Sequence, residues 1–127
     1  MEIVQLKSDN ARNSLNLLYE VLNEPYSACI RDATLQRFQN AFETFWRFLK
    51  EYFKTNKGIV VNFSKDCFRE IFIAGFTSEE ETENLLKMAD SKNEITYTYN
   101  EEIINKIYLE IKDYAELMDK VLSKVKD

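Results

Sequence analysis

Residues that end helices and build turns are scarce in this chain, which contains two glycines and one proline in 127 residues. An all-β protein needs many more turns. A glycine-rich phosphate loop or dinucleotide fingerprint needs several glycines close together, and Gly58 and Gly75 stand far apart. The length fits one domain, because domains cluster near ~100–150 residues. We therefore expect a single all-α domain that spans residues 1–127.

Hydrophobic residues recur at three- and four-residue steps through most of the chain, the pattern of helices with one buried face. Pro25, Gly58 and Gly75 end three pieces of this pattern. Ser78 and Glu81 have the spacing of a capping box, which opens another piece. We expect five helices: from Ser8 or Asp9 to Asn23, from about Ser27 to Asn56, from Ser64 as N-cap to Gly75, from Ser78 to about Ala89, and from Asn100 as N-cap toward the C-terminus.

Two segments do not fit this pattern. Residues 59–63 form a short apolar link, which we expect to be an extended loop because a single strand would have no partner. Residues 90–100 are expected to be a connecting loop, in which Tyr97 and Tyr99 alternate with polar residues. Loops on a rigid helical scaffold often carry function. The alternative is a plain connector whose tyrosines pack their rings and keep their hydroxyls in water.

The chain contains no histidine. This excludes Ser-His and Cys-His nucleophilic pairs and imidazole-ligated zinc or iron sites. Acidic runs such as residues 79–81 are better explained as charges at a helix N-terminus than as a Mg²⁺ site. We therefore expect no metal site and no cofactor of the chain's own.

Charge and hydropathy restrict the partners and the compartment. The net charge is −5 and the pI is about 4.9, which argues against a surface that wraps double-stranded DNA. No stretch approaches ~18 uninterrupted apolar residues, so we expect no membrane-spanning helix, and the first residues do not resemble a signal peptide. Cys29 and Cys67 are far apart, and we expect both to be small buried side chains of a reduced, cytoplasmic protein.

Several runs of residues together resemble a known family. They are Arg31-Asp32-Ala33-Thr34-Leu35-Gln36-Arg37-Phe38, then Phe42-Glu43, Trp46 and Lys50, then Phe68-Arg69-Glu70 with Ala74-Gly75, then Lys92-Asn93, and Tyr97-Thr98-Tyr99-Asn100-Glu101-Glu102. From about Leu15 to Leu122 the chain resembles the nucleotidyltransferase substrate-binding protein family of the HEPN superfamily. The resemblance implies an up-and-down helical bundle that forms a homodimer. It also implies a partner, a small nucleotidyltransferase encoded nearby in bacteria and archaea, in a pair that often acts as a toxin–antitoxin module.

The resemblance also implies particular roles for the segment before the last helix. Active HEPN proteins carry an Arg, a polar residue and then a His there, and two protomers join these residues into a metal-independent ribonuclease site. Lys92 stands at the Arg position, Asn93 is kept, and Tyr97 stands at the His position. Tyr99 stands where the partner can adenylylate a tyrosine, which silences the nuclease. Lysine lacks the planar fork that binds phosphate bidentately, and a phenol with a pKa near ~10 is a poor general base.

The second predicted helix carries a further set of candidate residues. A nucleotide, substrate or partner groove could be lined by Arg31, Gln36, Arg37, Glu43, Trp46 and Lys50. The same polar residues, with Arg47, could instead form a solvated face with four-spaced ion pairs worth tenths of a kcal/mol each. The residues alone leave both interpretations open.

Three hypotheses for function follow. The first is a non-catalytic substrate-binding or partner subunit that docks a nucleotidyltransferase and presents a substrate, or its own Tyr99, to it; ATP and Mg²⁺ are then expected on the partner. The second is a metal-independent HEPN ribonuclease toxin that uses Lys92, Asn93 and Tyr97 and is silenced by adenylylation; only this hypothesis involves RNA. The third is a helical interaction protein that shares only the scaffold, because fold alone does not determine function.

Overall fold

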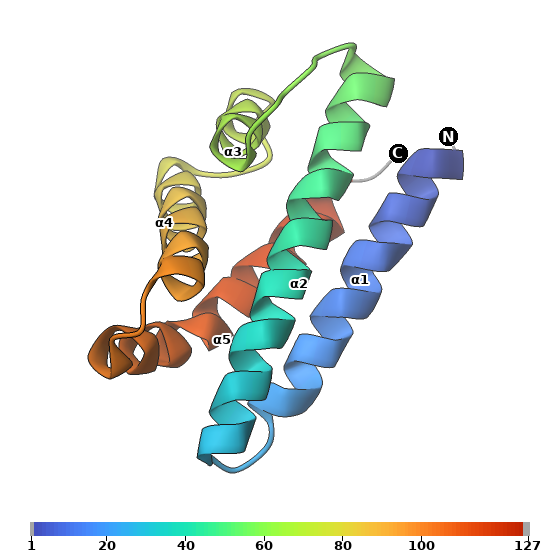
Figure 1. Cartoon of the computed structure of the whole chain (residues 1–127). Coiled ribbons are helices and arrows are strands. Elements are labelled where there is room, and N and C mark those ends of the chain that lie inside the picture. Colours follow the sequence, from blue (N-terminus) through green and yellow to red (C-terminus); the bar gives the residue numbers. More distant parts are fainter. Residues whose placement is uncertain (1, 126–127) are drawn as a thin grey trace.

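The computed structural model describes residues 2–125, which form five α-helices and a short π-helical turn and contain no strand (Figure 1). The elements are α1 (Glu2–Leu22), α2 (Ala28–Tyr52), the π-helical turn η1 (Phe53–Lys57), α3 (Ser64–Ile73), α4 (Glu79–Tyr97) and α5 (Glu101–Lys124). The prediction of an all-α bundle of about five helices is confirmed. No helix within residues 2–125 is long and apolar enough to cross a membrane.

Helix α2 is the centre of the bundle. It runs antiparallel beside α1 along most of its length, α5 crosses behind it, and α4 lies on the side away from α1 (Figure 1). The buried face of α2 carries three fully covered phenylalanines, Phe38, Phe45 and Phe48. The ring centroid of Phe68 from α3 lies 6.0 Å from that of Phe45, so α2 joins all the other helices into one hydrophobic core.

The helix ends follow their local sequence signals. The Ser27 hydroxyl accepts a hydrogen bond from the Ile30 backbone N–H (3.0 Å) at the start of α2. Ser78 and Glu81 form the predicted capping box at the start of α4. Asn100 is the N-cap of α5, as predicted. Gly58 follows η1 with a φ of 67°, a left-handed conformation that glycine adopts without a steric penalty.

Three predicted boundaries are wrong. Helix α1 begins at Glu2, six residues before Ser8, because Val4 is 2% exposed and adds a further turn to the buried face. Phe63, rather than Ser64, is the N-cap of α3, and its extended backbone makes no side-chain cap hydrogen bond. Residues 90–97 continue α4 instead of forming a loop, because contacts to other helices stabilise the extra turns.

The two cysteines differ in exposure. Cys67 is buried, and this burial raises the pKa of its thiol to about 12, which makes it an inert core side chain. Cys29 lies exposed in the first turn of α2. The prediction that both cysteines are buried is therefore wrong for Cys29, because the first turn of α2 projects beyond the core.

Candidate functional site

The candidate residues near the end of α4 do not share one surface. Lys92 and Asn93 lie on α4 and Tyr97 is its last residue. Successive helical residues are rotated by about 100°, so Asn93 and Tyr97 share a face that Lys92 does not. Both are exposed, whereas the Lys92 side chain is 22% exposed and turns toward α2. Within one chain, the structure therefore separates Lys92 from Asn93 and Tyr97.

Lys92 is held by α2. Its ammonium Nζ lies 3.2 Å from Glu43 Oε1 and 5.9 Å from the centroid of the Phe42 ring. Removing a charge from water is costly unless the charge is paired, and Glu43 supplies the pairing here. The positive charge of Lys92 is thus already compensated within the protein.

Glu43 is the acceptor of a wider group, which we name the Glu43 cluster: Glu43, Trp46, Arg47 and Lys92. Its second carboxylate oxygen, Oε2, accepts hydrogen bonds from Trp46 Nε1 and Arg47 Nε, each at 3.2 Å. Lys50 Nζ lies 5.7 Å from the centroid of the Trp46 ring, within range of a cation–π contact. The structure therefore places Glu43, Trp46 and Lys50 next to one another on α2, and brings Lys92 of α4 against Glu43.

A second contact joins α2 and α4 closer to the tyrosines. Gln39 Nε2 donates to Thr96 Oγ1 (3.2 Å), and the Thr96 hydroxyl donates in turn to the Lys92 carbonyl (3.2 Å). Gln39 lies one helical turn before Glu43 and Thr96 one turn after Lys92, so both pairs lie on the same two facing surfaces. Sequence reasoning missed Gln39 and Thr96, although their four-residue spacing from Glu43 and Lys92 would have indicated them.

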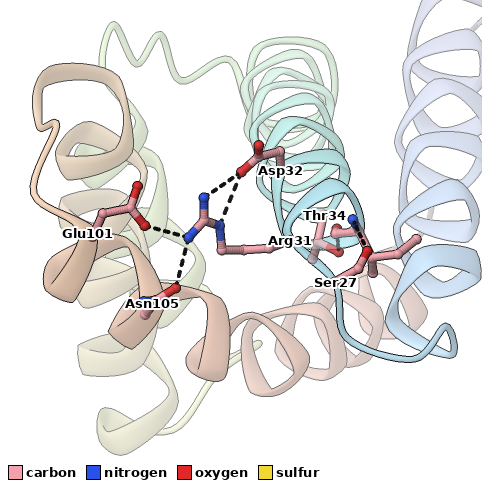
Figure 2. Close-up of polar contacts among 7 residues, drawn as sticks. Ser27, Arg31, Asp32, Thr34, Glu101 and Asn105 are labelled. Carbon is pink, nitrogen blue, oxygen red and sulfur yellow. Dashed lines mark hydrogen bonds and ion pairs between the residues drawn. The ribbon is translucent and has the colours of Figure 1, made fainter.

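Arg31 forms a separate group, the Arg31 cluster, with Asp32, Glu101 and Asn105 (Figure 2). Arg31 Nη1 donates to Glu101 Oε2 (2.6 Å) and to Asn105 Oδ1 (3.1 Å), while Nε and Nη2 donate to Asp32 Oδ1 (3.1 and 3.0 Å). The hydrogen bond to Glu101, followed by the one to Asp32, raises the pKa of the guanidinium.

The Arg31 cluster fixes the first turn of α5. The Arg31 side chain is 13% exposed, and Glu101 is the first residue of α5. The planar fork of arginine suits such simultaneous contacts. Because its donors are engaged by protein groups, Arg31 holds the start of α5 against α2 in this structure.

Gln36 and Arg37 lie apart from both clusters. Arg37 Nη1 donates to the Leu17 carbonyl of α1 (2.8 Å), and Gln36 Nε2 reaches Asn40 Oδ1 within α2 at 3.4 Å. The six residues proposed for one groove therefore do not share one place. Glu43 and Trp46 lie in the Glu43 cluster with Lys50 beside it, Arg31 lies in its own cluster, Arg37 contacts α1, and Gln36 contacts Asn40 within α2.

Tyr97, the last residue of α4, and Tyr99, in the short connection to α5, both point into solvent. Their exposed fractions are 82% and 99%. The contacts of α4 with α2 precede this connection and the Arg31 cluster follows it, so both ends are anchored. Asn100 N–H donates to Thr98 Oγ1 (3.1 Å), which orders the turn between them. The arrangement presents two phenol groups to solvent on a short, anchored connection.

No group of three or more His, Cys, Asp or Glu side chains that could hold a metal ion is present within residues 2–125. The carboxylates at the two clusters are instead engaged by arginine, lysine and tryptophan donors. The chemistry that the described residues offer is therefore that of exposed hydroxyl groups beside paired charges.

Comparison of the sequence with known protein families identifies the family to which this chain belongs. The family model described as nucleotidyltransferase substrate binding protein like matches residues 6–127, so the chain belongs to this family. No protein with a curated description matches the sequence. A crystal structure of a protein from Thermus thermophilus is 33% identical, with a TM-score of 0.86 over 92% of this chain and 99% of that chain.

More distant structures share the helical bundle. One is a tri-AMPylated Shewanella oneidensis HEPN toxin in complex with an MNT antitoxin, at 13% identity and a TM-score of 0.78 over 97% of this chain and 96% of that chain. Another is a toxin–antitoxin structure with AMP-PNP, at 13% identity and a TM-score of 0.81 over 99% of both chains. At this identity the similarity shows a common HEPN-type fold.

Proposed function

We propose that this protein is the partner subunit of a small nucleotidyltransferase in a two-component module of the toxin–antitoxin type, and that Tyr99 accepts a nucleotidyl group from that enzyme. The observation that carries the proposal is the 99% exposure of Tyr99 on a connection anchored at both ends. A tyrosine that packs against nothing in its own chain is available to a partner's active site. The protein acts as a cytoplasmic homodimer in this proposal.

Two further observations support the proposal. The chain belongs to the nucleotidyltransferase substrate binding protein like family. A HEPN toxin of the same fold is AMPylated and is bound to an MNT antitoxin. That toxin shares only 13% identity with this chain, so the role of Tyr99 rests on its exposure and its place before α5.

The proposed reaction is a nucleotidyl transfer to a phenol. The Tyr99 hydroxyl oxygen attacks the α-phosphorus of ATP and forms an O–P bond, while the bond between the α-phosphorus and the bridging oxygen breaks. Pyrophosphate leaves, and the phenol proton passes to a base of the partner. ATP and Mg²⁺ are bound by the partner in this scheme, and Mg²⁺ offsets the charge that develops on the phosphates.

The ribonuclease alternative has less support. Metal-independent RNA cleavage needs a general base and a cation for the phosphate. The chain has no histidine, and the cation at position 92 is already paired with Glu43. Only the ribonuclease alternative requires this protein to bind RNA.

The test uses the full chain co-expressed with the nucleotidyltransferase encoded beside it. The complex is isolated by size-exclusion chromatography, incubated with ATP and Mg²⁺, and analysed by intact mass and peptide mapping. We expect one or more AMP additions that map to Tyr99 and disappear in Tyr99→Phe. Tyr97→Phe is the matched control, because it removes the neighbouring exposed phenol, and it should retain the adduct.

Two results would contradict the proposal at different points. Absence of a complex would remove the partner-subunit function itself. A stable complex whose adduct persists in Tyr99→Phe would retain the module and exclude Tyr99 as the acceptor. RNA cleavage by the isolated chain, lost in Lys92→Ala, would favour the ribonuclease alternative.

A further inference from the structure

A hollow of about 170 Å³ lies between α1 and α2, away from the tyrosines, and its lining is strongly basic. It is lined by Lys7 of α1 and by Arg47, Lys50, Glu51 and Lys54 of α2 and the turn that follows it. We name it the Lys50 pocket. Four cations and one carboxylate meet here on a protein whose net charge is −5, so this is a local reversal of the overall charge.

The three lysines of the Lys50 pocket have no carboxylate partner within residues 2–125, whereas the fourth cation, Arg47, is already paired with Glu43 (Nε to Oε2, 3.2 Å). Lys7 and Lys54 have no ion-pair or hydrogen-bond partner within residues 2–125. Lys50 contacts the face of the Trp46 ring, at 5.7 Å from its centroid, rather than a carboxylate. This differs from Lys92 and Arg31, whose charges are matched by Glu43 and Glu101.

Lysines without a carboxylate partner, gathered in a hollow, form a favourable environment for an anion. Like charges held close together repel one another, and a concave surface with a low-dielectric wall concentrates the field. Lys7 and Lys50 are half-buried, so their charges are less screened by water than those of lysines on an open helix face. An anion that enters the Lys50 pocket would relieve this repulsion and gain charge-assisted hydrogen bonds.

The size of the Lys50 pocket restricts the ligand. Sites that enclose a whole drug-sized ligand have volumes of about 300–1,000 Å³, and this hollow has about 170 Å³. A whole nucleotide does not fit inside, whereas a chain of phosphate groups is compact and carries the charge that the lining matches. Lysines bind such groups as point charges and arginine as a fork.

We infer that the Lys50 pocket binds the phosphate chain of a polyphosphate ligand through Lys7, Arg47, Lys50 and Lys54. The ligand's phosphates come either from a nucleoside triphosphate or from an inorganic polyphosphate. This site is separate from Tyr99, and its occupation does not require a nucleotidyltransferase partner.

The experiment titrates the isolated full chain with ATP, inorganic tripolyphosphate and AMP at physiological salt, with binding measured by calorimetry and by backbone NMR shifts. We expect tripolyphosphate and ATP to bind with saturable shifts confined to the part of α1 and α2 around the pocket, and AMP to bind more weakly. Equal affinities for ATP and tripolyphosphate identify the phosphate chain as the recognised group. A higher affinity for ATP identifies a nucleotide as the source.

Charge-removing variants test the assignment. Lys50→Ala with Lys54→Ala should weaken tripolyphosphate binding by about tenfold or more, a change of at least ~1.4 kcal/mol in binding free energy. The matched control, Lys106→Ala with Lys112→Ala, removes the same charge from exposed positions of α5 and should bind like the unmodified chain. A circular dichroism melt checks that both variants fold.

Three outcomes would overturn the inference. Tripolyphosphate could fail to bind at physiological salt, or its shifts could spread over lysines throughout the chain. The control variant could lose as much affinity as the pocket variant, which would indicate general attraction between charges. Binding of ATP without binding of tripolyphosphate would also exclude the phosphate chain as the recognised group.

Discussion

The tyrosines in the core and those at the α4–α5 connection have opposite environments. The Tyr114 hydroxyl lies 3.0 Å from Ser91 Oγ in a buried hydrogen bond, and its ring stacks on Phe38 with centroids 5.8 Å apart. Tyr97 and Tyr99 are almost fully exposed. A tyrosine side chain therefore stabilises the bundle at position 114. At positions 97 and 99 it is exposed to solvent and contributes little to the stability of the fold.

Tyr114 is held in a core that includes Phe38. The largest expected loss of stability comes from removing the Phe38 ring, on which Tyr114 stacks. Phe38 is fully buried, so Phe38→Ala leaves a cavity and should lower the free energy of unfolding by about 3–5 kcal/mol. Chemical denaturation monitored by circular dichroism measures this change. Phe63→Ala is the control, because Phe63 is 69% exposed, and it should change stability little. Equal losses in both variants would contradict the assignment of Phe38 to the core.

The hydroxyl of Tyr114 allows a finer test. Tyr114→Phe removes the partner of a buried Ser91 hydroxyl, and an unsatisfied buried polar group costs about 1–3 kcal/mol. Replacing both groups, in Ser91→Ala with Tyr114→Phe, should cost less than the sum of the two single changes, because no polar group is then left unpaired. Denaturation of the four proteins of this cycle gives the coupling energy. A coupling of zero would mean that the hydrogen bond does not stabilise the fold.

Periodicity in the sequence predicted most of the fold, and tertiary contacts account for the principal error. The buried stripes and the Ser78–Glu81 capping box are local signals, so five helices and most of their ends could be predicted. The continuation of α4 through Tyr97 could not, because its last turns are stabilised by side chains far away in the sequence. Ser91 bonds to Tyr114, Lys92 pairs with Glu43, and Gln39 donates to Thr96.

The candidate site also contains some features that the sequence could predict and others that only the tertiary structure determines. Family resemblance selected Glu43, Trp46, Lys50 and Lys92, which the fold does bring together. It could not predict that Arg37 donates to a backbone carbonyl of α1, because no side-chain pattern encodes that acceptor. Nor could it indicate the Lys50 pocket, since Lys7 lies outside the predicted first helix and reaches α2 only because α1 begins at Glu2.

A third tyrosine, Tyr19, makes a contribution to the stability of the fold that depends on pH. Burial, followed by the nearby charge of Asp119, raises the pKa of Tyr19 to about 12, and its hydroxyl donates to Asp119 Oδ2 (3.2 Å). A raised pKa means that the folded state holds the proton more tightly than the unfolded state, whose tyrosine pKa is about 10. The resulting stabilisation is complete below pH ~10 and is lost as the pH rises toward ~12.

The difference between the unmodified chain and Tyr19→Phe isolates this contribution from the titration of lysines. We expect the unmodified chain to lose about 1 kcal/mol more than Tyr19→Phe between pH 10 and 12, less than the full linkage value, because water screens a hydroxyl that is only partly buried. Denaturation at several pH values measures both slopes. Parallel slopes for the two proteins would show that Tyr19 does not titrate differently on folding.

The smallest expected effect on stability is at Tyr99, the tyrosine that we propose as the acceptor of the nucleotidyl group. Tyr99→Ala removes a side chain that is 99% exposed, so the free energy of unfolding should stay within about 0.5 kcal/mol of its original value. Denaturation of this variant beside Tyr114→Phe measures the contrast directly. A loss above about 1 kcal/mol for Tyr99→Ala would mean that the ring packs in solution and is not freely available to a partner. A Tyr99→Ala variant that is as stable as the unmodified chain but no longer accepts AMP would show that Tyr99 is needed for the reaction and not for folding. In that variant the anchored connection remains, and only the acceptor side chain is missing.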